Sequence, residues 1–332
     1  MKEVSIICPI YNEERFIETC IQSVLAQDYP QDKWELLLVD GGSTDKTREL
    51  IAPYLKQYPN IRLLDNPRRT APCAMNIGIR EAQGVYICRM DAHSSFPTHY
   101  VSTLLRYLNE LPDASNVGGV CETMPANESK KAQAIAIACS HTLGVGNSMF
   151  RTAKVHEPVK ADTVPFGFWR KSLFDQMGMF DEEMTRNQDD EFNARTIQNG
   201  GHIYLVPGIC IRYFARDTLA KTWGMFYQYG LFKPLVNKKI KHPATVRQFV
   251  PLLFVISLLI GLPLACLFPM VRIIYLTIIA LYIVLLGFEG LKYKNAYLPP
   301  VFATIHIGYG LGYLHGIVKV LCKRPFYVET NR

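Results

Sequence analysis

Four short apolar runs, separated by segments of helical periodicity, restrict the fold of the first 90 residues. The runs are residues 4–10, 35–39, 61–64 and 85–90. Continuous apolar runs of this length are typical of strands buried on both faces. Between them, apolar residues recur at helical spacing from Phe16 to Leu25, and residues 71–83 read as a helix ended by Gly84. The alternation predicts an α/β fold, a mostly parallel sheet flanked by helices.

Polar residues follow three of these runs, at the strand ends where parallel sheets bind their ligands. They lie in residues 9–13, 40–45 and 91–93. Asp40 comes directly after a buried run, where a carboxylate is costly unless it is paired or solvated. As a hydrogen-bond acceptor, its carboxylate suits a nucleoside base or ribose.

Asp91 and His93 are two residues apart after the fourth run. In extended chain both side chains face the same way. One carboxylate and one imidazole can hold a divalent ion that bridges a diphosphate. An Asx-turn followed by a surface histidine explains the same spacing and stays open on the pattern alone.

A second acidic group, residues 188–191, precedes a helical stretch that contains Arg195. Acids in the first turn of a helix complement its dipole, which is one account of the group. The other account is that one carboxylate acts as a general base and that Arg195 helps to hold the segment. The sequence alone leaves both accounts open.

Charge and cysteine content exclude several classes of function. The 332 residues carry a formal charge of +7, with 36 Lys and Arg against 29 Asp and Glu. The basic residues are not concentrated in the front of the chain, so we expect no nucleic-acid partner. Nine cysteines without a CxxC pair favour a reducing compartment over a disulfide framework or a zinc site. The sequence has no dinucleotide-binding, P-loop, serine-hydrolase or zinc-protease motif.

The last third of the chain is typical of a membrane segment. Residues 249–268, 273–288 and 298–318 are apolar stretches close to the length that spans a bilayer. Gly308, Gly312 and Gly316 form a small-residue face suited to close helix packing. We therefore expect a soluble domain over residues 1–232, a basic juxtamembrane linker over 233–248, and a membrane segment over 249–332 with two or three apolar helices.

The orientation of this segment is less simple. Basic residues in 233–247 place the front domain in the cytoplasm, although a solvated loop would look similar. Three crossings would carry Lys319, Lys323 and Arg324 to the far side, against this charge rule. One stretch is therefore open to being re-entrant or interfacial. The N-terminus has no long apolar region, so we expect no cleaved signal peptide.

Four motifs in order resemble those of the inverting family 2 glycosyltransferases with a GT-A fold. They are VSIICPIYNEE, WELLLVDGGSTDKT, NIGIREAQGVYICRMDAHS and NQDDEFNARTIQNGG, and they spread over residues 3–232. The Asp-Ala-His variant and the apolar tail look most like bacterial enzymes of succinoglycan and exopolysaccharide biosynthesis. The resemblance implies a GT-A sheet domain followed by C-terminal transmembrane or interfacial helices.

The resemblance also implies roles by position. Pro9, Tyr11 and Glu13 match the first nucleotide-binding loop, and Asp40 matches the acid that contacts the base. Asp91 matches the first acid of the Asp-x-Asp metal motif, and His93 replaces the second, which favours Mn²⁺ and leaves Mg²⁺ open. Asp189 matches the catalytic base. The Gln-x-x-Arg-Trp motif of processive synthases is absent, which favours transfer of one sugar.

The resemblance therefore implies a metal-dependent, inverting glycosyltransferase. Its donor would be a nucleotide-sugar, with a UDP-sugar favoured, and its acceptor a hydroxyl of a lipid-linked saccharide in exopolysaccharide, capsule or O-antigen synthesis. The expected location is the inner (cytoplasmic) membrane, with the catalytic domain facing the cytoplasm. Two alternatives stay open: a polyprenyl-phosphate sugar synthase and a non-catalytic membrane assembly subunit.

Overall fold

The computed structural model describes residues 1–243 and 245–326. These residues divide into two compact units, each built from two segments of the chain. The sheet unit comprises residues 1–122 and 153–213, and the helical unit comprises residues 123–152 and 214–326. The domain limits expected at residues 232 and 248 stay predictions.

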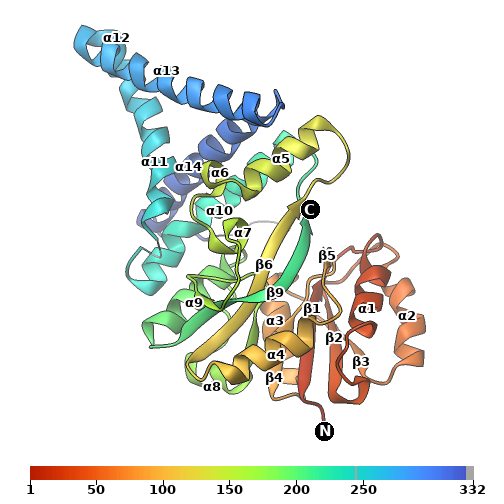
Figure 1. Ribbon diagram of the computed structural model, residues 1–332. Coiled ribbons are helices and arrows are strands. Elements are labelled where there is room, and N and C mark those ends of the chain that lie inside the picture. The colour runs from red at the N-terminus through yellow and green to blue at the C-terminus, as the bar shows by residue number, and fades with distance from the viewer. Residues whose placement is uncertain (244, 327–332) are drawn as a thin grey trace. The chain divides into compact units, whose positions relative to one another are not determined.

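Among the described residues, nine strands form one sheet in the order β3-β2-β1-β4-β8-β6-β9-β5, with β7 paired to β9 (Figure 1). The strands are β1 (Val4–Ile10), β2 (Trp34–Asp40), β3 (Ile61–Asp65), β4 (Tyr86–Arg89), β5 (Ser94–Ser95), β6 (Ala114–Met124), β7 (Val159–Lys160), β8 (Phe168–Arg170) and β9 (His202–Phe214). The first four strands are parallel, as predicted. The strands β8, β6, β5 and β7 pair antiparallel with their neighbours, so the sheet is mixed.

Helices cover both faces of the parallel strands. The helices of the sheet unit are α1 (Ile17–Leu25), α2 (Thr47–Gln57), α3 (Ala71–Glu81), α4 (Tyr100–Glu110), α8 (Ser172–Met177) and α9 (Gln188–Gln198), with a 3₁₀ turn η1 (Gln31–Lys33). Side chains of a strand alternate between its faces. Ile6 packs in one apolar cluster with Ile17 of α1, and Ile7 packs in another with Met75 of α3. The predicted sheet with flanking helices is confirmed.

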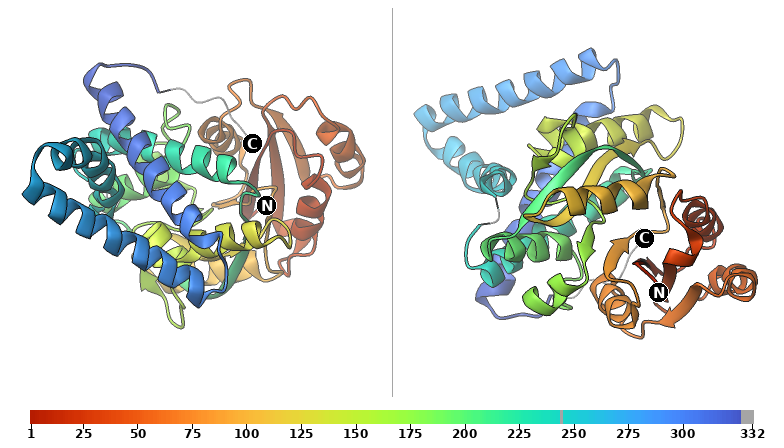
Figure 2. Two further views of the ribbon diagram at one scale, coloured as in Figure 1. Left: turned by 90° about the horizontal axis from the view of Figure 1, so that it is seen from above. Right: turned by 60° about the horizontal axis from the view of Figure 1, so that its bottom comes forward.

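The helical unit contains two groups of helices. Those before the apolar stretches are α5 (Lys130–Ser140), α6 (Thr142–Val145), α7 (Met149–Thr152) and α10 (Leu219–Ile240). The apolar stretches form η2 (Val246–Gln248), α11 (Phe249–Ile256), a π-helical segment η3 (Ser257–Gly261), α12 (Leu262–Leu267), α13 (Pro269–Lys292) and α14 (Leu298–Leu321). α13 lies at the edge of this unit in both views of Figure 2.

Three segments are long and apolar enough to cross a membrane, judged by length and composition. They are Val246–Leu267, Pro269–Lys292 and Leu298–Leu321. The expected apolar C-terminal helices are therefore confirmed, and of the two or three expected the structure forms three. They give the chain elements that can span a membrane or lie at its surface.

Candidate active site

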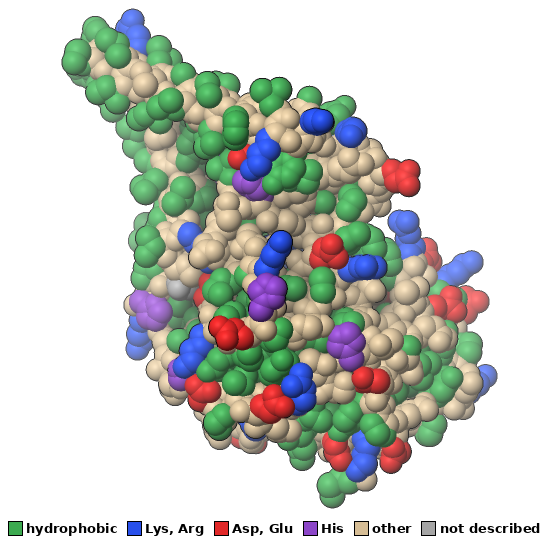
Figure 3. Space-filling model, viewed as in Figure 1, with side chains coloured by type: hydrophobic (Ala, Val, Ile, Leu, Met, Phe, Trp, Pro, Cys, Tyr) green, Lys and Arg blue, Asp and Glu red, His purple; other side chains and the backbone are tan. Residues whose placement is uncertain are grey.

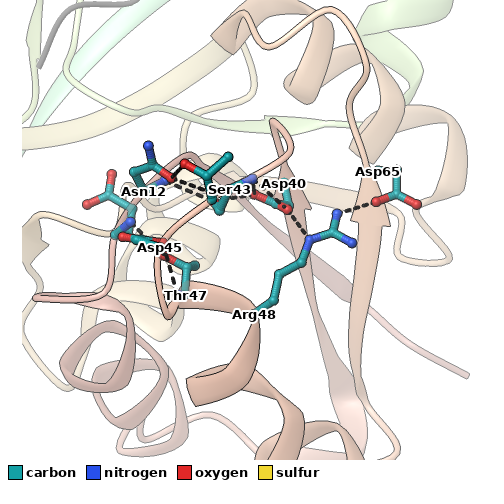
Figure 4. A network of polar contacts seen from close by, with 9 residues as sticks. Asn12, Asp40, Ser43, Asp45, Thr47, Arg48 and Asp65 are labelled. Atoms are coloured by element: carbon teal, nitrogen blue, oxygen red, sulfur yellow. Dashed lines mark hydrogen bonds and ion pairs between the residues drawn. The ribbon is translucent and has the colours of Figure 1, made fainter.

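The loops that follow β1 and β2 are joined by hydrogen bonds between polar side chains and backbone amides (Figure 4). The backbone N–H of Asn12 donates to Ser43 Oγ at 2.8 Å, and the N–H of Thr44 donates to Asn12 Oδ1 at 2.8 Å. The N–H of Glu13 donates to Thr47 Oγ1 at 2.7 Å. Both loops are thereby fixed before any ligand binds.

Asp40 organises the second of these loops. Its carboxylate is fully buried and accepts hydrogen bonds from the Ser43 hydroxyl at 2.6 Å and from Nε of Arg48. The other end of the Arg48 guanidinium pairs with the exposed Asp65 at the end of β3 (Figure 4). The burial cost expected for Asp40 is thus offset by a cation and a hydroxyl. A nucleobase would reach this carboxylate only if Ser43 or Arg48 moved.

Tyr11 lies next to the start of the same loop. A Cβ built on Gly41 would lie 3.2 Å from the Tyr11 ring, so this position admits a side chain only if the ring moves. The guanidinium carbon of Arg69 lies 5.9 Å from the centre of the ring, within the range of a cation–π contact. Pro9 stands one residue before the end of β1, opposite Val39 of β2. The three predicted positions 9, 11 and 40 therefore line adjoining strand ends.

Glu13 and His93 connect the loop after β1 with the loop after β4. The Glu13 side chain is buried, and its Oε1 lies 4.0 Å from Nδ1 of His93. The imidazole is partly exposed and meets the ring of Tyr213 edge-on, with 6.0 Å between the ring centres. His93 therefore contacts a buried acid and an aromatic ring, and its role as a metal ligand stays a prediction.

Arg89, the last residue of β4, links the two predicted acidic positions. Its Nε and Nη2 donate to the two oxygens of Asp91 at 2.8 and 3.0 Å. Its Nη1 donates to both oxygens of Asp189 at 2.9 and 3.1 Å. The Arg89 side chain is only 7% exposed, so this pairing takes place largely out of water. Asp91 and Asp189, far apart in sequence, share a single guanidinium.

Burial and charge move the pKa values of these groups in different directions. Burial, opposed in part by Arg89, raises the pKa of Asp189 above its ordinary value, and the nearby Asp91 charge adds to the rise. Burial acts the same way on Asp91, but the Arg89 charge outweighs it and lowers the pKa of that carboxyl. Burial alone disfavours the Arg89 cation, yet the two carboxylates raise its pKa. Two carboxylates of unlike basicity are typical of acid–base sites.

The helix α9 that carries Asp189 is held in place by polar and aromatic contacts. Arg195 donates to the Glu191 carboxylate at 2.7 and 2.9 Å and to the carbonyl of Met179 at 2.9 Å. The Asn193 amide bridges Asn116 of β6 and Thr163, at 2.9 and 2.8 Å. The predicted holding role of Arg195 is consistent with these bonds.

Phe192 completes the anchoring of α9. It packs in a fully buried aromatic cluster whose other members are Trp169, Phe174 and Phe180. Phe192 is three residues after Asp189, about one helical turn along α9. Its burial in the core therefore fixes the rotation of α9 about its axis and the position of its first turn. Packing in the core thus fixes the position of the Asp189 carboxylate.

The structure brings the predicted residues of two distant segments together, and it adds two that the sequence did not single out. Asp91 and Asp189 meet through Arg89, while Asp40 is held by Arg48. Both arginines were missed: Arg89 lies inside the third motif but had no role assigned to it, and Arg48 directly follows the second motif. The signal available for Arg89 was a charged residue in the apolar run 85–90.

The residues present suit a divalent ion with few protein ligands. In the part of the chain that the structure describes, no group of three or more His, Cys, Asp or Glu side chains is arranged to hold a metal. Each oxygen of Asp91 accepts one N–H from Arg89 and keeps a further lone pair, and the imidazole of His93 offers nitrogen. Ions bound by one or two side chains usually take their remaining ligands from substrate phosphates and water.

Comparison with known sequences relates this chain to one protein family and to individual relatives. Residues 5–177 match the sequence model described as glycosyl transferase family 2. A dolichyl N-acetyl-α-D-glucosaminyl phosphate 3-β-D-2,3-diacetamido-2,3-dideoxy-β-D-glucuronosyltransferase of Methanococcus voltae is 32% identical, over 72% of this chain and 75% of its own. The succinoglycan biosynthesis protein ExoA of Rhizobium meliloti is 29% identical, over 74% of each chain.

Solved structures agree on the fold. The mannosyltransferase PcManGT from Pyrobaculum calidifontis, solved with GDP-Man and Mn²⁺, superimposes with a TM-score of 0.59. The alignment covers 97% of this chain and 87% of that one, with 19% sequence identity. At this identity the likeness concerns the fold, and the expected GT-A type of sheet domain is confirmed.

Proposed function

The chain belongs to glycosyl transferase family 2, and we propose that it transfers one sugar from a nucleotide-sugar to a hydroxyl of a lipid-linked saccharide. The observation that supports this proposal best is the pairing of Asp91 and Asp189 with one guanidinium. Arg89 joins Asp91, which would hold the ion that faces the diphosphate of the donor, with Asp189, whose raised pKa suits proton transfer. A UDP-sugar is the proposed donor.

Asp189 is proposed as the general base. In its ionised form it takes the proton of the acceptor hydroxyl as the oxygen attacks the anomeric carbon. A bond forms between that oxygen and the anomeric carbon while the bond to the diphosphate oxygen breaks, so the carbon is inverted in one displacement. Arg89 donates to both Asp189 oxygens and orients the carboxylate during this step.

The donor is proposed to lie along the strand ends. Pro9, Tyr11 and Glu13 would border the nucleotide, and Asp40 would position its base through the loop that it organises. Asp91 and His93 would hold a divalent ion, with Mn²⁺ preferred because one ligand is an imidazole. Such an ion offsets the charge that develops on the leaving diphosphate.

The acceptor is proposed from the helical unit and from the relatives. Three helices with the length and composition of membrane spans suit an enzyme whose acceptor is anchored in lipid. The printed name of the Methanococcus relative refers to a dolichyl phosphate sugar, and that of the Rhizobium relative to succinoglycan. By analogy, we place the reaction in exopolysaccharide, capsule or O-antigen synthesis, at the inner membrane with the sheet unit in the cytoplasm.

The test is transfer of radiolabelled sugar by Asp189→Asn to a hydroxyl acceptor. Loss of the base should reduce kcat by about 10²–10⁴-fold while the donor still raises the melting temperature of the variant. The exposed Asp175→Asn, at the single acidic residue of α8, is the matched control and should keep full activity.

Two other results would contradict the proposal. A polyprenyl-phosphate acceptor is already ionised and needs no base, so full activity of Asp189→Asn with such an acceptor would identify a polyprenyl-phosphate sugar synthase. If no nucleotide-sugar stabilises the wild-type protein, with or without Mn²⁺, the chain would be a non-catalytic membrane subunit.

A further inference from the structure

The three apolar segments of the helical unit differ in how far protein covers them. In α14, 44% of the most apolar window is buried, against 17% in Val246–Leu267 and 11% in Pro269–Lys292. α14 packs against α10, α11, α13 and α5, and its only large apolar side chains in the exposed class are Val318 and Leu321, near its end. Protein neighbours therefore cover a larger share of α14 than of the other two segments.

The glycine face of α14 fits against α10, with both helices running in the same direction. Gly308, Gly312 and Gly316 meet Trp223, Tyr227 and Leu231 in that order along the two helices. A Cβ on Gly312 or Gly316 would overlap a backbone carbonyl oxygen of α10. The close packing predicted from the glycine spacing is confirmed, and the partner is α10.

Polar side chains add to this contact. Asn237 of α10 donates to the Tyr313 hydroxyl at 2.8 Å, and Tyr227 meets His315 at 2.5 Å. α10 also carries four lysines, Lys221, Lys233, Lys238 and Lys239. A lysine costs about 2.5–3.5 kcal/mol at the centre of a bilayer, and Lys233 lies in the interior of α10, while the other three lie near its ends. α14 can enter the hydrocarbon only with α10, and the lysines oppose that.

The segment from α11 to α13 is built differently, as an antiparallel hairpin over residues 249–292. The rings of Phe254 and Tyr282 pack at a tilt with 4.8 Å between their centres, and Gly261 lies against the ring of Tyr275. At the tip, Arg272 Nε donates to the carbonyl of Ala265 at 2.9 Å. The two limbs thus support each other without help from other helices along the outer half of the hairpin.

Apolar side chains cover the outside of the hairpin. The exposed ones include Leu253, Leu259, Ile260, Leu267, Met270, Ile273, Ile274, Ile278, Leu281, Val284 and Phe288. Figure 3 shows such side chains along α12 and α13, with basic side chains at the tip and at the far end of α13. Between residues 249 and 288 the only charged residue is Arg272. A surface of this kind in water is a site for a partner or a membrane.

Basic residues lie near both chain ends of the hairpin, before residue 249 and after residue 291. Lys238, Lys239, Lys241 and Arg247 precede it, and because α10 and α14 run parallel, the tail residues Lys319, Lys323 and Arg324 lie at the same end of these helices. Lys292 and Lys294 follow the hairpin. The chain there is tied to the start of α5 by the bond from Asn295 Nδ2 to the Lys130 carbonyl, at 2.7 Å.

We propose that the hairpin of residues 249–292 is the only described segment that inserts into the bilayer, and that α14 stays outside the hydrocarbon with α10. The occupant of the exposed apolar surface is the acyl region of a membrane with anionic headgroups, each nearby basic side chain contributing about 1 kcal/mol. Both basic groups then face one leaflet. Three crossings would put Lys319, Lys323 and Arg324 on the far side, against the charge rule. With two crossings these residues stay on the side of residues 233–247, and the rule is obeyed.

Native thiols allow a direct test in the full chain. Three cysteines are exposed, Cys210, Cys266 and Cys322, and the other six are buried. The parent for labelling has serine at the three exposed positions, and either Cys322, after α14, is restored or the exposed Lys294→Cys, before α14, is added. A membrane-impermeant maleimide should label both proteins, each with a single exposed thiol, in the same vesicle preparation, either right-side-out or inverted. Labelling in opposite preparations would mean that α14 crosses the bilayer and would overturn the proposal.

A second measurement identifies what covers the hairpin. After an alkaline carbonate wash the protein should stay with the membranes, and Ile278→Lys with Leu281→Lys should lower the retained fraction several-fold. Val246→Lys, exposed but outside the hairpin, is the matched control and should change little. Release of the wild type as a soluble dimer would mean that a second copy covers this surface. Neither measurement depends on sugar transfer, so its failure differs from failure of the proposed function.

Discussion

Arg89 and Asp189 are 100 residues apart in the chain, and Nη1 of the arginine donates to both carboxylate oxygens of the aspartate. The same guanidinium holds both oxygens of Asp91. Removing this cation would leave two carboxylates facing each other in a largely buried site. Arg89 is therefore expected to matter for stability and for catalysis.

Arg89→Gln is expected to lower the free energy of unfolding by about 3 kcal/mol, the lower end for a broken buried pair. The lower end applies because Asp189 is 31% exposed and water can reach its charge. Arg106→Gln breaks the exposed pair with Glu110 and should cost less than about 1 kcal/mol. Chemical denaturation of both variants measures the difference. Equal losses would show that the buried pairs contribute little.

The pH dependence of kcat/KM should have an acid limb above the ordinary Asp pKa of about 3.9. Asp189 accepts a proton only when ionised, and its pKa is raised, chiefly by burial. Activity is therefore present above this raised pKa and is lost as the pH falls through it. In Arg89→Gln the residual activity should show this limb at higher pH, because the cation that favours the carboxylate is gone. A limb that does not move would assign it to another group.

His93→Asp is expected to change the metal preference of the enzyme. An imidazole ligand favours Mn²⁺ over Mg²⁺, whereas a second carboxylate suits Mg²⁺. The ratio of activity with Mn²⁺ to activity with Mg²⁺ should fall by more than about tenfold, the smallest effect usual for groups around a metal. The exposed His156→Asn should leave the ratio unchanged. If chelation with EDTA leaves the wild type fully active, the proposed metal dependence is wrong.

Arg48→Met is expected to weaken donor binding with little change in kcat. Arg48 pairs with the buried carboxylate of Asp40, and its loss frees the loop from residue 41 to 45. A lost charged hydrogen bond is worth about 1.5–3 kcal/mol, which corresponds to a KM for the donor raised about 10–100-fold. Arg80→Met, on the exposed side of α3, is the control. A KM equal to that of the control would mean that the loop does not bind the donor.

Gly312→Ala is expected to destabilise the helical unit by about 1–3 kcal/mol, the usual cost of overpacking. The added methyl group would overlap the carbonyl oxygen of Tyr227, which cannot move without shifting α10. Gly287→Ala in α13 has no atom within 4 Å of the new Cβ, and helix propensity alone should make it neutral or stabilising. Thermal unfolding in detergent compares the two. Similar melting temperatures would contradict the tight contact of α14 with α10.

Local patterns were enough to predict the parallel half of the sheet and the strand-end residues. Buried strands leave apolar runs, and the chemistry of a parallel sheet collects where those runs end, so Asp40 and Asp91 could be found from the sequence. The second half of the sheet was not visible in the same way. β6 and β9 are long antiparallel strands whose partners are distant in sequence, so neither shows the repeating strand–helix alternation.

The pairing of Arg89 with Asp91 and Asp189 could not be predicted because it depends on long-range packing. Apart from the charge of Arg89, residues 85–90 look like any buried strand, and nothing local indicates that Arg89 turns towards a helix 100 residues later. That helix is placed by Asn193 and Phe192 in the core. In the same way, the glycine spacing predicted a close helix contact, while the choice of α10 as partner followed only from the structure.

The grouping of one guanidinium with two carboxylates leaves a net charge of −1 when all three are ionised. A free nucleotide diphosphate is itself an anion and would be repelled by this centre, whereas its complex with a divalent cation would not. We expect ordered entry: the donor arrives already bound to its cation, or follows the cation into the site. On the proposed mechanism, the arrangement of Arg89, Asp91 and Asp189 would thus select the ionic form in which the substrate is accepted.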